Sequence, residues 1–274
     1  MKKPIIISVV NHKGGVLKTT TTTNLGAALA RKGYKVLLVD LDAQQNLTAG
    51  LIGSLEYKEN EPTLFDALID ETSLDHLIRQ TDEKNLDIIP VTEDFAGADI
   101  SLVSAVGRES ILKNCFAQTK NLKKYDFIFL DNPPSISLVV MNALVASDYF
   151  LVPCSSEYLP MMGLSLLGSS IGKMQKVAPQ LRPLGVVLTM YSRNERICRQ
   201  VENTLRKELG ETVFDSKVRV NTKAKAAPSV RKTIFQYENS SGGRGTKDYL
   251  AVANEFIERV SAMESENLEA VVNG

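Results

Sequence analysis

The stretch PIIISVVNHKGGVLKTTTTTNLG, residues 4–26, decides the fold of this chain. It begins with a short run of branched apolar residues, continues through a glycine pair between two lysines, and then reaches a run of threonines. A buried strand that leads through a glycine loop into a helix forms an anion cradle, because the loop N–H groups and the helix N-terminus point at one site. The stretch therefore predicts a strand, a phosphate-binding loop and a helix.

The loop departs from the phosphate-loop pattern G-x-x-x-x-G-K-[ST], because His12 and Leu17 stand where that pattern has glycine. Lys18 is expected to reach the β- and γ-phosphates, and Thr19 to place its hydroxyl on Mg²⁺. A leucine at position 17 is expected to take an unstrained φ, since a positive φ is unfavourable for a branched side chain. The predicted nucleotide-binding residues of the loop are Lys13, Gly14, Gly15, Val16, Leu17, Lys18, Thr19 and Thr20.

Apolar runs and helical stripes alternate along the rest of the chain. Continuous apolar runs indicate strands buried on both faces, and their alternation with helices favours a parallel sheet. We predict an α/β fold with a doubly wound, mostly parallel sheet flanked by helices, in a single domain over residues 1–263 with a disordered acidic tail over 264–274. The runs lie at 4–10, 35–40, 86–91, 126–131, 149–154, 184–190 and 212–218, and the stripes at Leu25, Ala28 and Leu29, at Ile197, Val201, Leu205 and Leu209, and at Tyr249, Val252, Phe256 and Val260.

Carboxylates stand at the ends of two predicted strands. Asp40 ends one run and Asp42 follows two residues later, so both side chains are expected to point the same way. Asp131 ends another run and is followed by Pro133 and Pro134, which stiffen the chain. Ligands of open α/β sheets lie at the carboxyl ends of the strands, so these acids are candidates for one site with the loop.

The composition is that of a globular protein with unevenly distributed charge. The chain has 274 residues, 43% hydrophobic and 23% charged, with a net charge of zero. Its three cysteines lie far apart, which fits a reducing cytosol and argues against a disulfide framework or a local zinc site. Residues 56–99 hold thirteen acids and three bases, whereas residues 217–247, the basic segment, hold eight bases and one acid. Such a segment indicates an anion-binding surface, with a solvated charged loop as the alternative.

The pattern K-G-G-x-x-K-[ST] at residues 13–19 resembles the deviant Walker A motif of the ParA/MinD family of ATPases. VDLDAQQN at 39–46 resembles that family's first switch, and DNPPS at 131–135 its Walker B motif and second switch. The resemblance implies ATP and Mg²⁺ as cofactors and a homodimer bridged by ATP. It implies that Lys13 reaches the partner's phosphates and that Asp42 positions the attacking water. The catalytic residues that it implies are Lys13, Lys18 and Asp42. The metal-binding residues that it implies are Thr19, Asp40 and Asp131.

The basic segment resembles the family region that contacts the nucleotide base, with APS at 227–229 and Asn221 at the matching position. On the preceding predicted helix, Arg196, Arg199 and Arg206 lie opposite the apolar stripe. Lysines and arginines on one face neutralise DNA phosphates without reading bases. We therefore expect non-specific binding of double-stranded DNA through Arg196, Arg199, Arg219, Lys223, Lys225, Arg231 and Arg244.

The leading hypothesis is a ParA-like ATPase of plasmid or chromosome partitioning with a low intrinsic rate. In this hypothesis ATP-dependent dimerisation drives DNA binding, and a ParB-type centromere-binding partner stimulates hydrolysis and release. The expected location is the cytoplasm, on the nucleoid, without stable membrane association.

Three alternatives have different sequence requirements. A MinD-like ATPase that places cell-division machinery needs a basic amphipathic C-terminal helix, but the tail carries Glu264, Glu266 and Glu269 and no lysine or arginine. An iron–sulfur electron donor of the nitrogenase-reductase type needs two cysteines beside the switches, where neither Cys115 nor Cys154 lies. A scaffold that binds nucleotide without hydrolysing it is the third alternative, because of the leucine in the loop.

Overall fold

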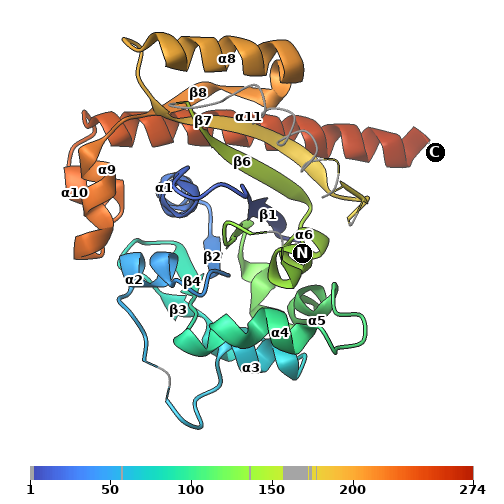
Figure 1. Cartoon of the computed structure of the whole chain (residues 1–274). Helices are drawn as coiled ribbons and strands as arrows, with labels where there is room; N and C mark the ends of the chain where they lie inside the picture. Colours follow the sequence, from blue (N-terminus) through green and yellow to red (C-terminus); the bar gives the residue numbers. More distant parts are fainter. Residues whose placement is uncertain are drawn as a thin grey trace.

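The computed structural model describes residues 3–56, 58–135, 137–156, 172, 175–176 and 178–273. Within these residues an eight-stranded sheet has the order β3-β4-β2-β5-β1-β6-β7-β8 (Figure 1). Neighbouring strands are parallel, except that β3 and β4 are antiparallel. The strands are β1 (Ile5–Val9), β2 (Val36–Asp40), β3 (Arg79–Gln80), β4 (Leu86–Ile89), β5 (Phe127–Asp131), β6 (Tyr149–Ser155), β7 (Arg182–Tyr191) and β8 (Val213–Arg219).

The continuous apolar runs form strands because both faces of the sheet are covered. Every residue of β1, β2, β5 and β6 is buried. Along β5, Phe129 faces one hydrophobic cluster and its neighbour Leu130 faces another on the opposite side. All of the predicted strands are confirmed, whereas β3 was not predicted because a two-residue, exposed strand has no apolar run.

Helices form a layer on each side of the sheet (Figure 1). α1 and α11 share one hydrophobic cluster with the strands, whereas α3, α4, α5 and α6 contribute to the cluster on the other side. α6 and α8 both contribute side chains to a third cluster over β6 and β7. The helices are α1 (Lys18–Arg31), α2 (Asn46–Leu51), α3 (Leu64–Ile69), α4 (Ala98–Leu102), α5 (Ile111–Gln118), α6 (Leu138–Ala146), α8 (Arg196–Leu209), α9 (Thr222–Ala226), α10 (Ile234–Glu238) and α11 (Arg244–Asn273), with 3₁₀ turns η1 (Asp75–Leu77), η2 (Glu93–Gly97), η3 (Lys120–Lys124), η4 (Gly210–Thr212) and η5 (Ala227–Val230).

The strand register brings sequence-distant acids to one edge of the sheet. Asp40, the last residue of β2, is paired with Asp131, the last residue of β5. Asp131 is also paired with Val9, after which β1 runs into the phosphate loop. The carboxyl ends of three adjacent strands therefore meet beside the N-terminus of α1, as the sequence predicts.

Two helix predictions are wrong in detail. The buried stripe of α8 is formed by Cys198, Val201 and Leu205, and Ile197 is 39% exposed. The buried thiol of Cys198 takes the core position that the predicted stripe assigns to Ile197. α11 continues to Asn273 instead of giving way to a disordered tail at 264. Its Glu264 accepts a hydrogen bond of 2.6 Å from the Tyr149 hydroxyl, which helps to hold the helix against β6. Gly274 lies outside the described residues.

None of the described helices is both long enough and apolar enough to cross a lipid bilayer.

Candidate functional site

The phosphate loop between β1 and α1 is held in shape by side chains of neighbouring strands. Asn11 donates from Nδ2 to the carbonyl of Pro153 (2.8 Å), and its Oδ1 accepts from the backbone N–H of Lys13 (3.0 Å). Thr189 of β7 donates from Oγ1 to the carbonyl of Val16 (3.1 Å). The loop is therefore anchored to β6 and β7, and its exposed glycines are left facing solvent.

Leu17 has a left-handed backbone, with φ 64° and ψ 36°, so the prediction of an unstrained φ is wrong. The turn into α1 requires this conformation, because the carbonyl of Leu17 accepts the first helical bond from Thr21 (2.9 Å). A left-handed conformation costs about 1–2 kcal/mol in a residue with a side chain. The leucine side chain packs against the hydrophobic cluster shared by α1 and α11, and this burial offsets the strain.

The two lysines of the loop have different surroundings. Lys18 is buried, and its Nζ donates to the carbonyl of Lys13 (3.4 Å) across the loop. Burial lowers the pKa of the Lys18 ammonium, while the nearby carboxylates of Asp131 and Asp42 oppose that shift. Lys13 has an exposed side chain. Lys18 is thus buried within the loop, whereas Lys13 projects from its surface.

Asp131 lies within reach of two threonines from α1. Its Oδ2 accepts from the hydroxyl of Thr19 (2.7 Å) and its Oδ1 from the hydroxyl of Thr22 (2.9 Å). Burial, and next the charge of Asp40, raise the pKa of Asp131 to about 7, against the two threonine hydrogen bonds. A nearly buried carboxylate beside a hydroxyl is a suitable ligand pair for a hard divalent cation such as Mg²⁺.

Thr22 was not among the predicted residues. The run of five threonines gives no compositional reason to choose between them, but Thr19 and Thr22 are three residues apart and so share one face of α1.

Asp40 is fully occupied by contacts within the chain. Its Oδ2 accepts from the N–H and the hydroxyl of Thr48 (2.9 and 2.7 Å), and its Oδ1 accepts from the N–H of Asp42 (3.1 Å). Burial raises the pKa of Asp40 to about 6, although these hydrogen bonds act in the opposite direction. Asp40 therefore fixes the end of β2 against α2, which is a positioning role in this structure.

Asp42 lies beyond the end of β2, so strand alternation does not set its direction. It is half-buried in a turn, where its Oδ1 accepts from the N–H of Gln44 (3.0 Å). Its charge opposes the lowering of the Lys18 pKa that burial causes. The structure thus brings Asp42, Lys18 and Asp131 to one site.

No group of three or more histidines, cysteines and acids among the described residues is arranged to hold a metal ion by itself. The three cysteines are all buried and free. A cation at Thr19 and Asp131 would therefore depend on ligands from outside the chain, such as phosphate oxygens and water.

Asn24, which was not predicted, joins the phosphate-loop helix to the basic segment. Its Nδ2 donates to the carbonyl of Thr20 (2.8 Å), and its Oδ1 accepts from the N–H of Ile234 at the start of α10 (2.7 Å). A second tie lies at the other end of α1, where Glu83 binds Arg31 (2.9 Å) and accepts from the hydroxyl of Thr233 (3.1 Å). No pattern in the sequence marks these long-range contacts.

Asn221 has both ends of its side chain engaged within the basic segment. Its Oδ1 accepts from the N–H of Lys223 (2.9 Å), which caps α9, and its Nδ2 donates to Glu238 (3.3 Å). The neighbouring turn η5 lies nearer the phosphate loop. A small cavity of about 20 Å³ has Thr20 of α1, Asn46 of α2 and Pro228 of η5 in its lining. A contact of Asn221 with the nucleotide base stays a prediction.

The predicted DNA-binding residues divide into two groups. Arg219 donates from Nη2 to Oδ1 of Asp248 (2.6 Å) and from Nε to its Oδ2 (3.1 Å). This ion pair raises the pKa of the guanidinium, so its charge is neutralised within the chain. Arg206, on the predicted basic face of α8, is paired with Glu202 and Asp215. The remaining six are exposed and form no ion pair with any described residue: Arg196, Arg199, Lys223, Lys225, Arg231 and Arg244.

The exposed cations of α8 and α9 come together through the sheet. Tyr191 at the end of β7 is in register with Arg219 at the end of β8. α8 begins shortly after β7 and α9 shortly after β8, so the cations at the starts of these helices lie at adjacent strand ends.

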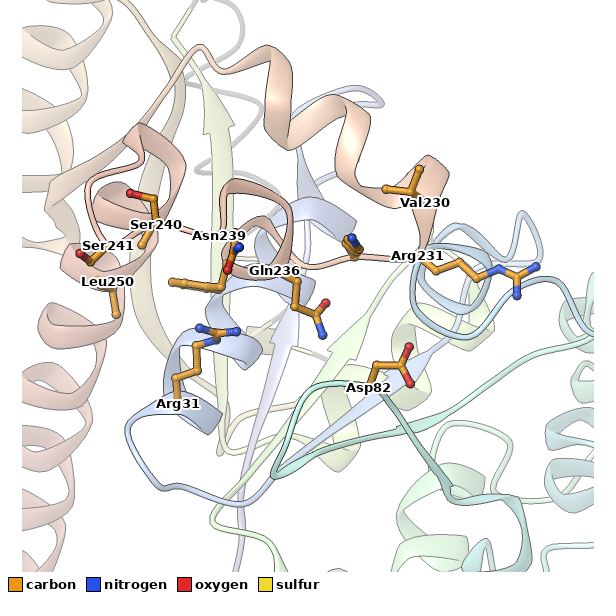
Figure 2. A pocket seen from close by; sticks show the side chains of 12 residues that line it. Arg31, Asp82, Val230, Arg231, Gln236, Asn239, Ser240, Ser241 and Leu250 are labelled. Carbon is orange, nitrogen blue, oxygen red and sulfur yellow. The ribbon is translucent and has the colours of Figure 1, made fainter.

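A groove of about 890 Å³ lies away from the phosphate loop (Figure 2). Arg31 rises into it from the end of α1, and Gln236 and Leu250 contribute from α10 and α11 (Figure 2). None of its lining residues belongs to the phosphate loop. The nucleotide site is therefore defined by the loop and the strand ends and not by this larger hollow.

Known proteins resemble the chain in both sequence and fold. A family model described as an AAA domain matches residues 4–182. The sporulation initiation inhibitor protein Soj of Bacillus subtilis is 40% identical over 251 residues, which cover 91% of this chain and 97% of that protein. The chromosome partitioning protein ParA of Caulobacter vibrioides is 34% identical over 255 residues, covering 93% and 94%.

Solved structures with the same architecture include a crystal structure of cobyrinic acid a,c-diamide synthase from Mycobacterium smegmatis with bound ATP analog and magnesium. It has a TM-score of 0.77 and 28% identity, and it covers 92% of this chain and 93% of that chain. A plasmid partition protein from Borrelia burgdorferi has a TM-score of 0.71 and 23% identity, covering 94% and 100%, which supports the fold alone.

Proposed function

The chain belongs to the ParA/MinD family of P-loop ATPases, and from that premise we propose that it is a partitioning ATPase whose ATP-bound dimer binds DNA. It hydrolyses ATP to ADP and phosphate with Mg²⁺, at a low intrinsic rate. A ParB-type partner stimulates hydrolysis and releases the protein from DNA, so that the protein cycles on and off the nucleoid.

The nucleotide chemistry follows from the contacts of the loop. The N–H groups of Gly14 to Thr20 cradle the phosphates, and Lys18 contributes a cation from within the loop. The Thr19 hydroxyl and the Asp131 carboxylate, whose oxygens are 2.7 Å apart, would hold Mg²⁺, with Asp40 supporting the site from β2. When bound, the metal would supply positive charge that offsets the negative charge of the phosphates. Asp42 orients the attacking water from its position beside Lys18.

Lys13 gives the loop its second function. Its side chain is exposed on the surface of the loop, whereas Lys18 is buried within it. A cation that reaches the phosphates of a second copy stabilises the dimer only when triphosphate is bound. Dimer formation therefore depends on whether ATP or ADP is bound.

DNA binds to exposed cations at the starts of α8 and α11, on α9 and directly after η5. Arg219 is left out of this surface, because its charge is neutralised by Asp248. The remaining side chains contact phosphates and not base edges, so the binding is independent of sequence and sensitive to salt. They are Arg196, Arg199, Lys223, Lys225, Arg231 and Arg244.

The observation that carries the proposal is that one loop holds a buried lysine, Lys18, and an exposed lysine, Lys13. DNA retention is measured for wild type and Lys13→Ala with ATP, with ADP and across a salt series. We expect ATP-dependent, salt-sensitive binding that Lys13→Ala abolishes. Lys113→Ala, which removes an exposed lysine from α5, serves as the control. Equal binding with ADP and ATP would contradict the proposed switch.

A further inference from the structure

Three large apolar side chains are exposed together on α4 and the turn that follows it. Ile100 is 79% exposed, Val103 56% and Val106 95%, and we refer to them as the apolar patch. The other exposed large hydrophobic residues among those described come from separate elements. A grouped apolar surface on a folded protein marks a site of association, whereas single exposed residues are ordinary.

The apolar patch is held rigidly from below. Asn142 of α6 donates to the carbonyl of Arg108 (2.6 Å) and accepts from the N–H of Leu112 (3.0 Å). Arg108 in turn donates to the carbonyl of Val103 (3.1 Å), which closes the turn. These hydrogen bonds hold the C-terminal flank of the segment against α6 and so define the conformation of the turn.

The patch adjoins the second switch. Asp99, next to Ile100 on α4, accepts from the N–H of Val139 in the first turn of α6 (2.9 Å). α6 begins a few residues after Asp131, which contacts Thr19 in the phosphate-loop helix. α4 itself is reached through η2 from the carboxyl end of β4, a neighbour of β2. The patch therefore stands at the same edge of the sheet as the nucleotide site.

The chemistry of the patch suits a second copy of this chain better than a nucleic acid. Its side chains carry no charge, and the adjacent Arg108 is paired with Glu109 (3.1 Å), so this arginine is neutralised within the chain. A two-fold interface presents identical surfaces to each other, and an apolar surface meets its own kind without like-charge repulsion. In the proposed dimer, the two copies contact each other at the nucleotide edge.

We propose that the apolar patch is part of the interface of the ATP-bound dimer, where it contacts the second copy of this chain. This inference rests on the proposed function, because that function places the nucleotide edge between two copies. It adds a hydrophobic contribution to the contact that Lys13 makes with the partner's phosphates in the proposed dimer. Burial of these side chains stabilises the dimer, while the triphosphate decides when it forms.

The test compares Val106→Glu and Ile100→Glu with Ile69→Glu, which places the same charge at an exposed apolar position on α3. The dimer dissociation constant is measured with ATP by light scattering over a dilution series, and ATP binding is followed with a fluorescent analogue. Because a buried unpaired charge is unfavourable, the two patch variants should dimerise about tenfold or more weakly, whereas Ile69→Glu should match wild type. ATP binding by the monomer should be unchanged in all three.

The outcomes separate the inference from the proposed function. If wild type stays monomeric with ATP, the proposed dimer and this interface fail together. If wild type dimerises and the patch variants do so equally well, the inference alone is overturned. Unchanged dimerisation with a loss of stimulation by a centromere-binding protein would also overturn it, and would assign the patch to that partner instead.

Discussion

The nucleotide edge and the basic segment use polar residues in opposite ways. At the nucleotide edge, Asp131 and Lys18 are buried, and the partners of each are fixed by the strand register and the start of α1. In the basic segment, Lys223, Lys225 and Arg244 are exposed and make no ion pair within the described ranges. The first region is organised before any ligand arrives, while the second provides charge without a defined partner.

This difference shows which region tolerates change. A buried polar group depends on each neighbour, so its replacement has large effects on chemistry or stability. An exposed cation contributes one phosphate contact among several, so its replacement is nearly additive.

The largest effect is expected for Asp131→Asn. Loss of the carboxylate should reduce ATP turnover by about 10²–10³-fold, as for other electrostatic groups at reacting phosphates or acyl groups. The stability of the metal-free protein should be unchanged or higher, because burial and Asp40 already disfavour charge at this position. Steady-state turnover and urea denaturation measure the two quantities. A marked fall in stability would mean that Asp131 is structural.

The pH dependence of stability sharpens the same point. Burial raises the pKa of Asp40 to about 6 and, with Asp40, that of Asp131 to about 7, whereas an unfolded aspartate has a pKa of about 3.9. The folded, metal-free protein therefore binds more protons than the unfolded chain between about pH 4 and 7, and its stability should fall as the pH rises through that window. Denaturation with a chelator present measures this, and Asp131→Asn should flatten the slope. A slope of the opposite sign would contradict the assignment.

Asn24→Ala is expected to weaken the connection between the two regions. The buried N–H of Ile234 loses its acceptor, so the free energy of unfolding should fall by about 1–3 kcal/mol. Asn194→Ala, at an exposed position without a positive φ in the turn before α8, provides the control and should change stability by less than about 0.5 kcal/mol. Urea denaturation compares the variants. Equal stability of the two would remove Asn24 from the connection.

Substitutions at Leu17 test whether the strained loop residue is compensated by packing. Leu17→Ala removes the packing and keeps the left-handed strain, whereas Leu17→Gly removes both. Leu17→Gly should therefore be more stable than Leu17→Ala by about 1 kcal/mol, which reverses the usual order of these residues near a helix. Thermal denaturation measures the difference, and ATP turnover of the glycine variant shows whether leucine slows hydrolysis. The ordinary order, with alanine more stable, would contradict the account.

The smallest effects are expected within the basic segment. Lys225→Ala should reduce the slope of log Kobs against log salt concentration for DNA by about 1, because one phosphate contact is lost. Arg219→Ala should leave that slope unchanged, since Asp248 neutralises the arginine. Fluorescence anisotropy with a duplex at several salt concentrations measures both slopes. Equal reductions would mean that Arg219 exchanges Asp248 for DNA.

The sequence predicted the nucleotide edge well because that edge depends on short-range order. Apolar runs define β1, β2 and β5. The run of β1 leads into the phosphate loop, and those of β2 and β5 end at Asp40 and Asp131. Parallel strands then bring Asp40 and Asp131 together without further information.

Features set by tertiary contacts were not predicted. The φ of Leu17 is decided by packing beneath the loop, and the stripe of α8 is decided by the fit of Cys198 against β6 and β7. Arg219 looks like any other base in the sequence, yet Asp248, twenty-nine residues away, neutralises it. The continuation of α11 beyond 263 likewise depends on Tyr149 of a distant strand.

The central claim is that a triphosphate is held between two copies of this chain, each of which contributes Lys13 to the other. The most direct test is the molar mass of wild type and Lys13→Ala with ATP and with ADP, measured by light scattering with and without long duplex DNA. We predict a dimer for wild type with ATP only, and a monomer for Lys13→Ala in every condition. A wild-type protein that remains monomeric with ATP, alone and on DNA, would contradict the account.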